Sequence, residues 1–404
     1  MKIVFANKYF FKKGGAERSF LLASNLLEKR GNEIVFFSMQ DPRNDASGAN
    51  EYFLSKVDYS HRDIKNFIKS SIRLLYSFEA RRNIERLIDQ ENPNIAHLNN
   101  IYHQISPSII HSLKKNKIPI VMSLRDYKLV CASYSMLAKG KPCEACKNGR
   151  YYNCLLKKCV KDSRAKSLLN TIEMYLHHKI MHIYDLVDVF ISPSLFLKNK
   201  LEEMGFKGKI VHLPNFVNLD EYEPEYNWEE NSIVYFGRLS KEKGVGTLIE
   251  AVKGLDITLK IIGDGPERQN LEMRAEKGEM KNVKFLGYLQ GDALKDEIRK
   301  SMFVILPSEC YENNPRSIIE GFALGKPALG AKIGGIPELV KEGETGLTFE
   351  PGNEEDLKEK ISLFAGQSED IVRFGKQARF FVEKELNEEK HYQSLMGIYN
   401  SLLP

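Results

Sequence analysis

The chain has 404 residues, of which 42% are hydrophobic and 10% aromatic, and its formal net charge is +5. This length exceeds what one hydrophobic core usually supports, and the composition is that of a globular protein, which excludes a disordered or fibrous chain. The mild positive charge permits an anionic partner such as a nucleotide, a phosphate or a membrane surface. It does not demand one, and we expect no nucleic-acid partner.

The first residues, MKIVFANKYFFKKGGAE, do not resemble a signal peptide, because the apolar run is short and no small-residue cleavage site follows. No stretch approaches the roughly 18 apolar residues that a membrane-spanning helix needs. We therefore expect a cytoplasmic protein without a transmembrane helix.

Short apolar runs alternate with helical stretches through the first half of the chain. The expected strands are residues 2–7, 33–38, 94–98, 118–124 and 189–194. The stretch 14–31 is typical of an amphipathic helix, with Phe20, Ala23 and Leu27 on one face and Gly31 as its stop. This alternation predicts a parallel sheet with helices on both faces.

The pattern starts again at residue 232. The second set of expected strands is 232–240, 257–265, 283–288 and 303–308, with a helix at 245–255. We therefore predict two similar α/β domains, 1–213 and 214–385, followed by a C-terminal helix within 386–404 that crosses back to the first domain. Ligands of such open sheets bind outside the carboxyl ends of the strands. The acidic, Pro- and Asn-rich segment 214–231 suits the link between the domains.

Residues 308–321 read SECYENNPRSIIEG and place Glu312 and Glu320 eight positions apart. Asn314 and Pro315 predict a helix start, with Asn as N-cap and Pro in the first position, and Gly325 predicts its end. Free N–H groups at that start suit a phosphate, and carboxylates beside it suit sugar hydroxyls. On this segment alone, the alternative of glutamates that merely complement the helix dipole stays open.

Several further segments of the chain carry motifs that follow one another in a defined order. They are GGAE at 14–17, YFGRLSKEKG at 235–244, IIGDGPE, VKFLGY and GGIPELVKEGETGLTFEPGN at 334–353. Together with residues 308–340, they resemble the signature of the retaining glycosyltransferases of family four. That resemblance covers nearly the whole chain and implies the GT-B fold, in which two Rossmann-like parallel-sheet domains face each other across a cleft.

The resemblance implies a donor site for a nucleotide-diphosphate sugar. Arg238 and Lys243 would hold the diphosphate in place of a metal ion, so we expect no cofactor for catalysis. Glu312 would bind the sugar near the reacting face, and Glu320 would bind the ribose. The remaining donor-site residues that we expect are Gly14, Gly15, Tyr288, Asn313, Asn314 and Pro315. For Tyr288, which would border the base, a place in the core is an equally open reading.

One segment departs from the family's pattern. Where relatives often carry a histidine after the fourth strand, this chain reads SLRDYKLVC and has Arg125 followed by Asp126. A guanidinium cannot accept a hydrogen bond, but it binds phosphate or a carboxylate-bearing sugar. We expect Arg125 to line the substrate site. Of His97 and His103, one is expected near the site, although a structural role is the more common one for such histidines.

Four of the six cysteines fall within CEACKNGRYYNCLLKKC, in an insertion at about 131–162. Disulfides are disfavoured in the cytoplasm, and four clustered thiolates suit a closed, structural zinc site. The expected ligands are Cys143, Cys146, Cys154 and Cys159, and reduced surface thiols are the alternative. Cys131 and Cys310 are expected to be small buried residues.

The segment 62–82 has apolar residues at helical spacing among lysines and arginines. An interfacial helix would show this pattern, and so would an amphipathic core helix, which is the reading we favour. A lipid-linked acceptor would favour peripheral contact with the inner face of the membrane.

The leading interpretation is a retaining, metal-independent hexosyltransferase. It would move a sugar from a nucleotide donor to a saccharide or lipid-linked acceptor, in the synthesis of a bacterial surface polysaccharide. A nucleotide-sugar epimerase of the same fold and a non-catalytic scaffold are the alternatives. Specificity in such folds lies in loop shape, so the donor and the acceptor are not predicted.

Overall fold

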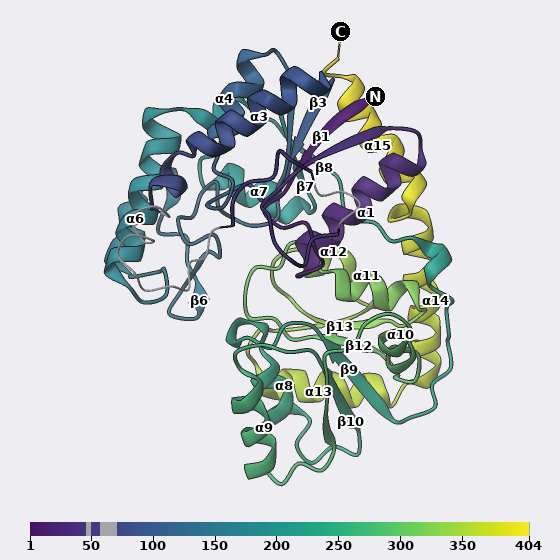
Figure 1. Cartoon of the computed structure of the whole chain (residues 1–404). Helices are drawn as coiled ribbons and strands as arrows, with labels where there is room; N and C mark the ends of the chain where they lie inside the picture. The colour runs from purple at the N-terminus through teal and green to yellow at the C-terminus, as the bar shows by residue number, and fades with distance from the viewer. Residues whose placement is uncertain (46–49, 57–70, 404) are drawn as a thin grey trace. The chain divides into compact units, whose positions relative to one another are not determined.

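The computed structural model describes residues 1–45, 50–56 and 71–403 of the chain. These residues form two compact units (Figure 1). Unit 1 comprises residues 1–138, 143–213 and 392–404, and unit 2 comprises residues 139–142 and 214–391.

Unit 1 is built on a six-stranded parallel sheet. The strands are β1 (Lys2–Ala6), β2 (Glu33–Phe37), β3 (Ile95–Leu98), β4 (Ile120–Ser123), β7 (Val189–Ser192) and β8 (Ile210–His212). They lie in the order β2-β1-β3-β4-β7-β8, and every pair of neighbours is parallel. Strands β3, β4 and β7 are buried along their whole length, as expected of a sheet covered on both faces.

Helices cover this sheet, and a short hairpin follows β4, with its residues 139–142 grouped with unit 2. The helices are α1 (Gly15–Lys29), α3 (Phe78–Glu91), α4 (Ser108–Lys115), α5 (Tyr152–Leu156), α6 (Arg164–Tyr175) and α7 (Leu195–Glu203). The shorter turns are η1 (Lys147–Gly149), η2 (Leu176–Ile180) and η3 (Ile183–Leu186), and the hairpin strands are β5 (Leu137–Ala138) and β6 (Lys141–Pro142). On α1 the side chains of Phe20, Ala23 and Leu27 are buried, so the predicted core face of this helix is confirmed.

Unit 2 repeats the parallel architecture. Its strands are β9 (Ser232–Phe236), β10 (Thr258–Ile262), β11 (Val283–Gly287), β12 (Val304–Leu306), β13 (Ala328–Ala331) and β14 (Gly346–Phe349). They lie in the order β11-β10-β9-β12-β13-β14, again with all neighbours parallel. The predicted α/β class with two parallel-sheet domains is therefore confirmed. Strands β8, β13 and β14 were not among the expected ones.

The elements around the second sheet complete the chain. They are η4 (Leu219–Glu221), η5 (Lys241–Lys243), α8 (Val245–Ala251), α9 (Arg268–Lys277), α10 (Asp292–Arg299), α11 (Arg316–Ala323), α12 (Ile336–Leu339), α13 (Glu354–Ala365), α14 (Ser368–Glu385) and α15 (Glu388–Asn400). Helix α15 begins in unit 2, and its residues from Tyr392 onward belong to unit 1.

The single helix expected at 62–82 is wrong in its described part, and residues 62–70 lie outside the described residues. Residues 71–75 are helical, the helix stops at Tyr76, and α3 begins afresh at Phe78. The reason is Ser77, whose hydroxyl accepts a hydrogen bond from the Ala80 N–H at 3.1 Å and caps α3. Arg73, one of the arginines of this segment, is not solvated: it is 6% exposed and donates to the Ser55 carbonyl. Across the described residues, no helix is long and apolar enough to cross a bilayer.

Candidate active site

The strand order of unit 2 reverses at β9. The chain leaves β9 toward β10 on one side and later returns on the other side to form β12. Ligands of open parallel sheets bind at the carboxyl ends of the two strands where the order reverses in this way. The loops that follow β9 and β12 carry Arg238, Lys243 and Glu312, so the fold brings these three predicted residues to one sheet edge.

Two glycines bring the backbones at this edge into close approach. Gly244 has φ +67°, and a Cβ there would lie 1.9 Å from the Pro307 carbonyl oxygen. Gly334 has φ +63°, and a Cβ there would lie 2.4 Å from the Glu312 carbonyl oxygen. Only glycine fits either place. The close approach at Gly244 keeps the neighbouring Lys243 beside the end of β12. The close approach at Gly334 packs that backbone against the backbone of Glu312.

Lys243 and Glu312 form the central ion pair of the site. The Lys243 ammonium contacts Glu312 Oε1, and the Ser308 hydroxyl donates to the same oxygen at 2.6 Å. Burial by itself would lower the pKa of Lys243, but the attraction of Glu312 outweighs it and raises that pKa. In the same way, Lys243 and Ser308 overcome the effect of burial and lower the pKa of Glu312. Both groups are therefore charged at neutral pH.

Arg238 and Tyr288 follow the ends of β9 and β11. The side chain of Arg238 is exposed, and its carbonyl accepts a hydrogen bond from the Tyr235 hydroxyl at 2.8 Å. Tyr288 is 67% exposed, so the alternative that placed it in the core is wrong. Both side chains are free to meet a ligand from solvent.

Helix α11 starts differently from the prediction. Pro315 is the N-cap residue rather than the first helical residue, and no side chain in the described structure caps the helix. Asn314, predicted as the cap, instead holds the interdomain segment: its Oδ1 and its carbonyl accept from the backbone and side-chain N–H groups of Asn215, both at 3.0 Å. The side chain of Asn314 is thus engaged with Asn215 and does not cap α11.

The carboxylate of Glu320 is buried and paired with an arginine. It is 4% exposed, and its Oε1 accepts from Arg316 Nε at 3.2 Å. Arg316 also donates to the Phe216 carbonyl at 3.2 Å. Sequence reasoning missed this partner, although Arg316 and Glu320 stand four residues apart, the spacing at which helical side chains meet.

In unit 1, Gly14 is the N-cap of α1 and has an extended backbone. A Cβ added to Gly15, the first residue of α1, would meet nothing within 4 Å among the neighbouring atoms. The described packing therefore does not require a glycine at position 15. His97 is a buried structural residue, hydrogen-bonded to the Tyr399 hydroxyl at 2.5 Å and to the Ser123 hydroxyl at 2.7 Å.

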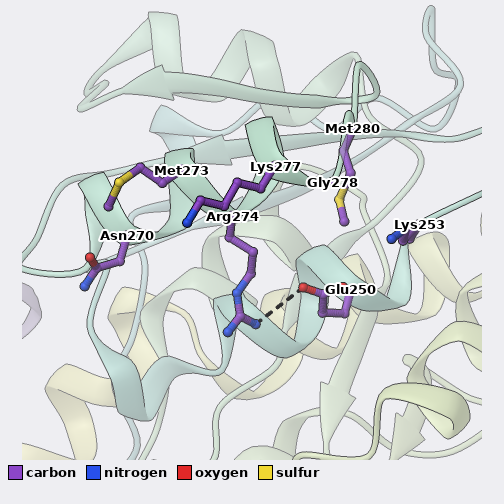
Figure 2. Close-up of a pocket in the computed structure, with 8 residues that line it drawn as sticks. All are labelled: Glu250, Lys253, Asn270, Met273, Arg274, Lys277, Gly278 and Met280. Atoms are coloured by element: carbon purple, nitrogen blue, oxygen red, sulfur yellow. Dashed lines mark ion pairs between the residues drawn. The ribbon is translucent and has the colours of Figure 1, made fainter.

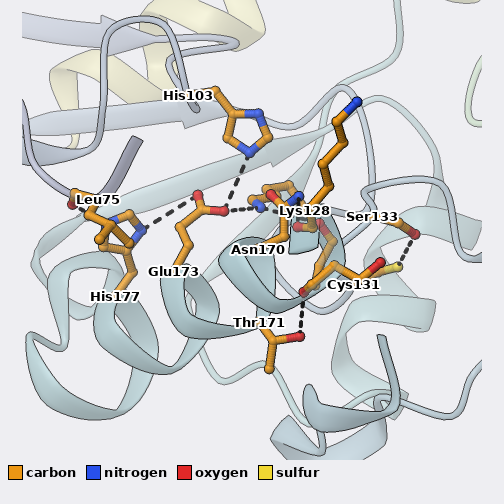
Figure 3. A network of polar contacts seen from close by, with 12 residues as sticks. Leu75, His103, Lys128, Cys131, Ser133, Asn170, Thr171, Glu173 and His177 are labelled. Atoms are coloured by element: carbon orange, nitrogen blue, oxygen red, sulfur yellow. Dashed lines mark hydrogen bonds and ion pairs between the residues drawn. The ribbon is translucent and has the colours of Figure 1, made fainter. Parts of the chain in front are cut away.

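A buried polar network surrounds Glu173 in unit 1 (Figure 3). Lys128 and Glu173 are 1% and 0% exposed and pair at 2.5 Å. His103 Nε2 lies 3.3 Å from the same carboxylate, and His177 Nδ1 lies 3.7 Å from its other oxygen. Sequence reasoning missed Lys128 as a partner of Glu173, because the two stand 45 residues apart, whereas His177 stands four residues from Glu173, at helical contact spacing. Arg125 itself is partly exposed and donates to Asn99 Oδ1 at 3.5 Å.

The cysteines of the insertion are all free thiols. The Cys159 thiol hydrogen-bonds to Cys154, which lowers the pKa of Cys154 and raises that of Cys159. Burial raises the pKa of Cys146 to about 12. Within the described residues, no three His, Cys, Asp or Glu side chains are arranged so that they could hold a metal ion. The zinc site thus stays a prediction.

A hollow of about 450 Å³ lies between α8 and α9 in unit 2 (Figure 2). Its lining includes Lys253, Met273 and Arg274, and Arg274 pairs with Glu250 at 3.7 Å. None of the predicted site residues lines it. The hollow is therefore separate from the sheet edge that carries Lys243.

Comparisons with known proteins decide the family. Residues 13–221 match the family described as Glycosyltransferase Family 4, and residues 220–380 match Glycosyl transferases group 1. The chain belongs to glycosyltransferase family 4.

The relatives of this glycosyltransferase agree with that membership. An uncharacterised glycosyltransferase of Methanocaldococcus jannaschii is 31% identical over 53% of this chain and 60% of its own length. An uncharacterised 42.6 kDa protein in the cps region of Klebsiella pneumoniae is 27% identical over 84% of this chain and 88% of its own length. The structure of Anabaena HepE in complex with UDP and glucose superposes with a TM-score of 0.70 at 16% identity, covering 99% of this chain and 100% of that one. The expected GT-B fold is thereby confirmed.

Proposed function

We propose that this glycosyltransferase moves a sugar from a nucleotide-diphosphate donor to a saccharide or lipid-linked saccharide acceptor, with retention of the anomeric configuration. The observation that carries the proposal is the Lys243–Glu312 pair at the strand-order reversal of unit 2, with the exposed Arg238 beside it. The relative solved with UDP and glucose supports a nucleotide-sugar donor. Unit 2 would take this donor and unit 1 the acceptor.

Arg238 and Lys243 would hold the donor diphosphate together with the uncapped start of α11. As the bond from the sugar C1 to the diphosphate oxygen breaks, negative charge grows on the leaving group, and fixed cations stabilise it without a metal ion. Glu312 would accept hydrogen bonds from sugar hydroxyls. The acceptor oxygen bonds to C1 on the face that the leaving group vacates, and its proton passes to the departing phosphate.

Other donor contacts follow from position. Arg316 holds Oε1 of Glu320, so we propose that the Arg316–Glu320 pair contacts the ribose as one unit. The exposed Tyr288 would border the base. Gly14 and Gly15 would let the start of α1 approach a phosphate, which gives position 15 a reason to be glycine that packing does not supply.

We also propose that the product is a bacterial surface polysaccharide made in the cytoplasm, with peripheral contact at the inner face of the membrane. The relative from the cps region supports the destination. A lipid-linked acceptor would require the contact, because such an acceptor does not leave the bilayer.

The experiment is a thermal-shift screen of nucleotide sugars on the full chain. One donor is expected to raise the melting temperature of the wild type, and to raise it much less in Glu312→Ala and Arg238→Ala. The matched control is Arg274→Ala, which removes an arginine in the α8–α9 hollow and should respond like the wild type. NMR of the product of the stabilising donor then reports the anomeric configuration. Equal shifts in all four proteins would contradict the donor site.

We further propose that the four cysteines Cys143, Cys146, Cys154 and Cys159 bind a structural zinc. The closeness of Cys154 and Cys159, which hydrogen-bond to each other, supports this, because clustered cysteines suit a structural zinc. Protein purified without chelator is expected to contain one zinc per chain by elemental analysis, and Cys154→Ser is expected to lose it. Cys310→Ser, which changes a cysteine of unit 2, is the control and should keep it. Zinc-free wild-type protein would overturn the proposal.

A further inference from the structure

Three buried asparagines gather where the strand order of unit 1 reverses. Strands β1 and β3 are neighbours at this reversal, and Asn7 follows β1 while Asn99 and Asn100 follow β3. Asn7, Asn99 and Asn100 are 1%, 2% and 7% exposed. Amide side chains are rarely buried without a purpose, because each brings donors and an acceptor that need partners.

The side chain of Asn7 connects the segments that follow β1 and β3 by hydrogen bonds. Its Oδ1 accepts from the Asn100 N–H at 3.2 Å, and its Nδ2 donates to the Tyr9 carbonyl at 2.7 Å. The Lys8 N–H donates in turn to the Asn100 carbonyl at 3.1 Å. The positions of Lys8, Asn99 and Asn100 at the sheet edge are therefore fixed by the fold.

Asn99 is oriented by Arg125. Its Oδ1 lies 3.5 Å from Arg125 Nη2, and because a guanidinium only donates, the oxygen of Asn99 must be the atom on that side. The amide nitrogen Nδ2 of Asn99 has no hydrogen-bond partner within the described structure, and neither does Oδ1 of Asn100. Two adjacent residues at this edge therefore leave one buried donor and one buried acceptor without a hydrogen bond. Such unpaired buried groups cost stability, which a ligand that pairs with them would restore.

The charge around these amides is positive. Lys8, Lys12 and Lys13 lie on the loop from β1 to α1, and Arg125 lies on the loop after β4. Two carboxyl groups lie nearby: Asp126 accepts from the Lys128 N–H at 2.9 Å and is also attracted by Lys8, and Glu173 pairs with the Lys128 ammonium. Lys8, Lys12, Lys13 and Arg125 together carry more charge than Asp126, so the charge of these two loops is positive and attracts an anion.

We propose that this edge of unit 1 is the subsite for an anionic group on the acceptor saccharide, a carboxylate or a phosphate. The inference rests on the proposed transfer function and names the acceptor's chemical class. Arg125 and Asn99 Nδ2 donate to the anionic oxygens, and Asn100 Oδ1 accepts from a neighbouring sugar hydroxyl. This set matches the unmet donor, the unmet acceptor and the local charge at once.

The test is equilibrium binding to the full chain, measured by calorimetry without donor. The probes are a glucosyl disaccharide, the matching glucuronyl disaccharide, and the glucosyl disaccharide 1-phosphate. We expect at least one anionic probe to bind tenfold or more tightly than the neutral one, and the tighter of the two identifies carboxylate or phosphate. Arg125→Gln and Asn99→Asp are expected to remove this preference. Arg125→Lys, which keeps the charge, should retain part of it and shows that the site still folds.

The control is Lys115→Gln, at the end of α4, where the chain turns back to the opposite edge of the sheet. It removes one exposed positive charge from the same unit and is expected to keep the preference. Equal affinity for neutral and anionic probes, no binding of any probe, or a preference that survives Arg125→Gln would each overturn the subsite. The thermal shift with nucleotide sugar is read separately, so that failure here and failure of the transfer function are distinguished.

Discussion

Replacing Glu312 by Gln is expected to lower the rate of sugar transfer by about 10²–10³-fold, the effect typical of losing one preorganised electrostatic partner. The substitution keeps the size of the side chain. It removes the charge that holds Lys243 and weakens the acceptor for sugar hydroxyls. Because the Lys243 ammonium is then left largely buried without its anion, stability should fall by about 1–3 kcal/mol. Initial rates at saturating donor and urea unfolding measure the two effects on one protein.

A double variant separates these two effects. Glu312→Gln combined with Lys243→Met removes both charges, and it is expected to recover stability while activity stays low. Glu250→Gln, which breaks the pair with Arg274 in the α8–α9 hollow, is the control for loss of a carboxylate from unit 2. Full activity in Glu312→Gln, with the stability loss as expected, would assign Glu312 a purely structural role.

Much of the fold was accessible from the sequence because its signals are local. The expected strands at 2–7 and 232–240 contain β1 (Lys2–Ala6) and β9 (Ser232–Phe236), because parallel strands are buried on both faces and leave no polar alternation. Phe20, Ala23 and Leu27 are buried as their helical spacing predicts. Short strands such as β13, with sequence ALGA, were missed because small residues carry little periodic signal and depend on their neighbours for burial.

Site residues that belong to a sequence motif were predictable. Contacts that depend on a partner distant in the sequence were not. Lys243 and Glu312 were found from separate motifs, and the structure shows that they touch. The sequence around Asn314 is typical of a helix cap, but its side chain instead accepts a hydrogen bond from the backbone N–H of Asn215, 99 residues away. No local pattern around Glu173 predicts Lys128 as its partner, because the two residues are 45 positions apart and meet only in the folded chain.

Replacing Glu173 by Gln is expected to lower the stability of the protein by about 3–5 kcal/mol, because it leaves the Lys128 ammonium buried without a counter-charge. The two side chains are 0% and 1% exposed, so solvent does not screen their attraction. Glu85→Gln is the matched control: it breaks a surface pair with Arg81 at 3.1 Å and should cost less than about 1 kcal/mol. The midpoint of urea unfolding at pH 7 compares them. A loss no larger than that of Glu85→Gln would contradict the role of the pair.

The same pair sets the direction of a pH dependence. Burial by itself would raise the pKa of the Glu173 carboxyl, but the attraction of Lys128 and His103 outweighs it and lowers that pKa. A carboxyl with a lowered pKa in the folded state contributes stability that is complete above its unfolded pKa, about 4.3, and that is lost as pH falls toward the folded value. The wild type should therefore lose stability between about pH 5 and pH 3, and Glu173→Gln should lose less of it over the same range. Unfolding curves at pH 7, 5 and 3 test this. Parallel losses in the two proteins would mean that other carboxylates govern the acid sensitivity, because Gln at this position has no proton to take up.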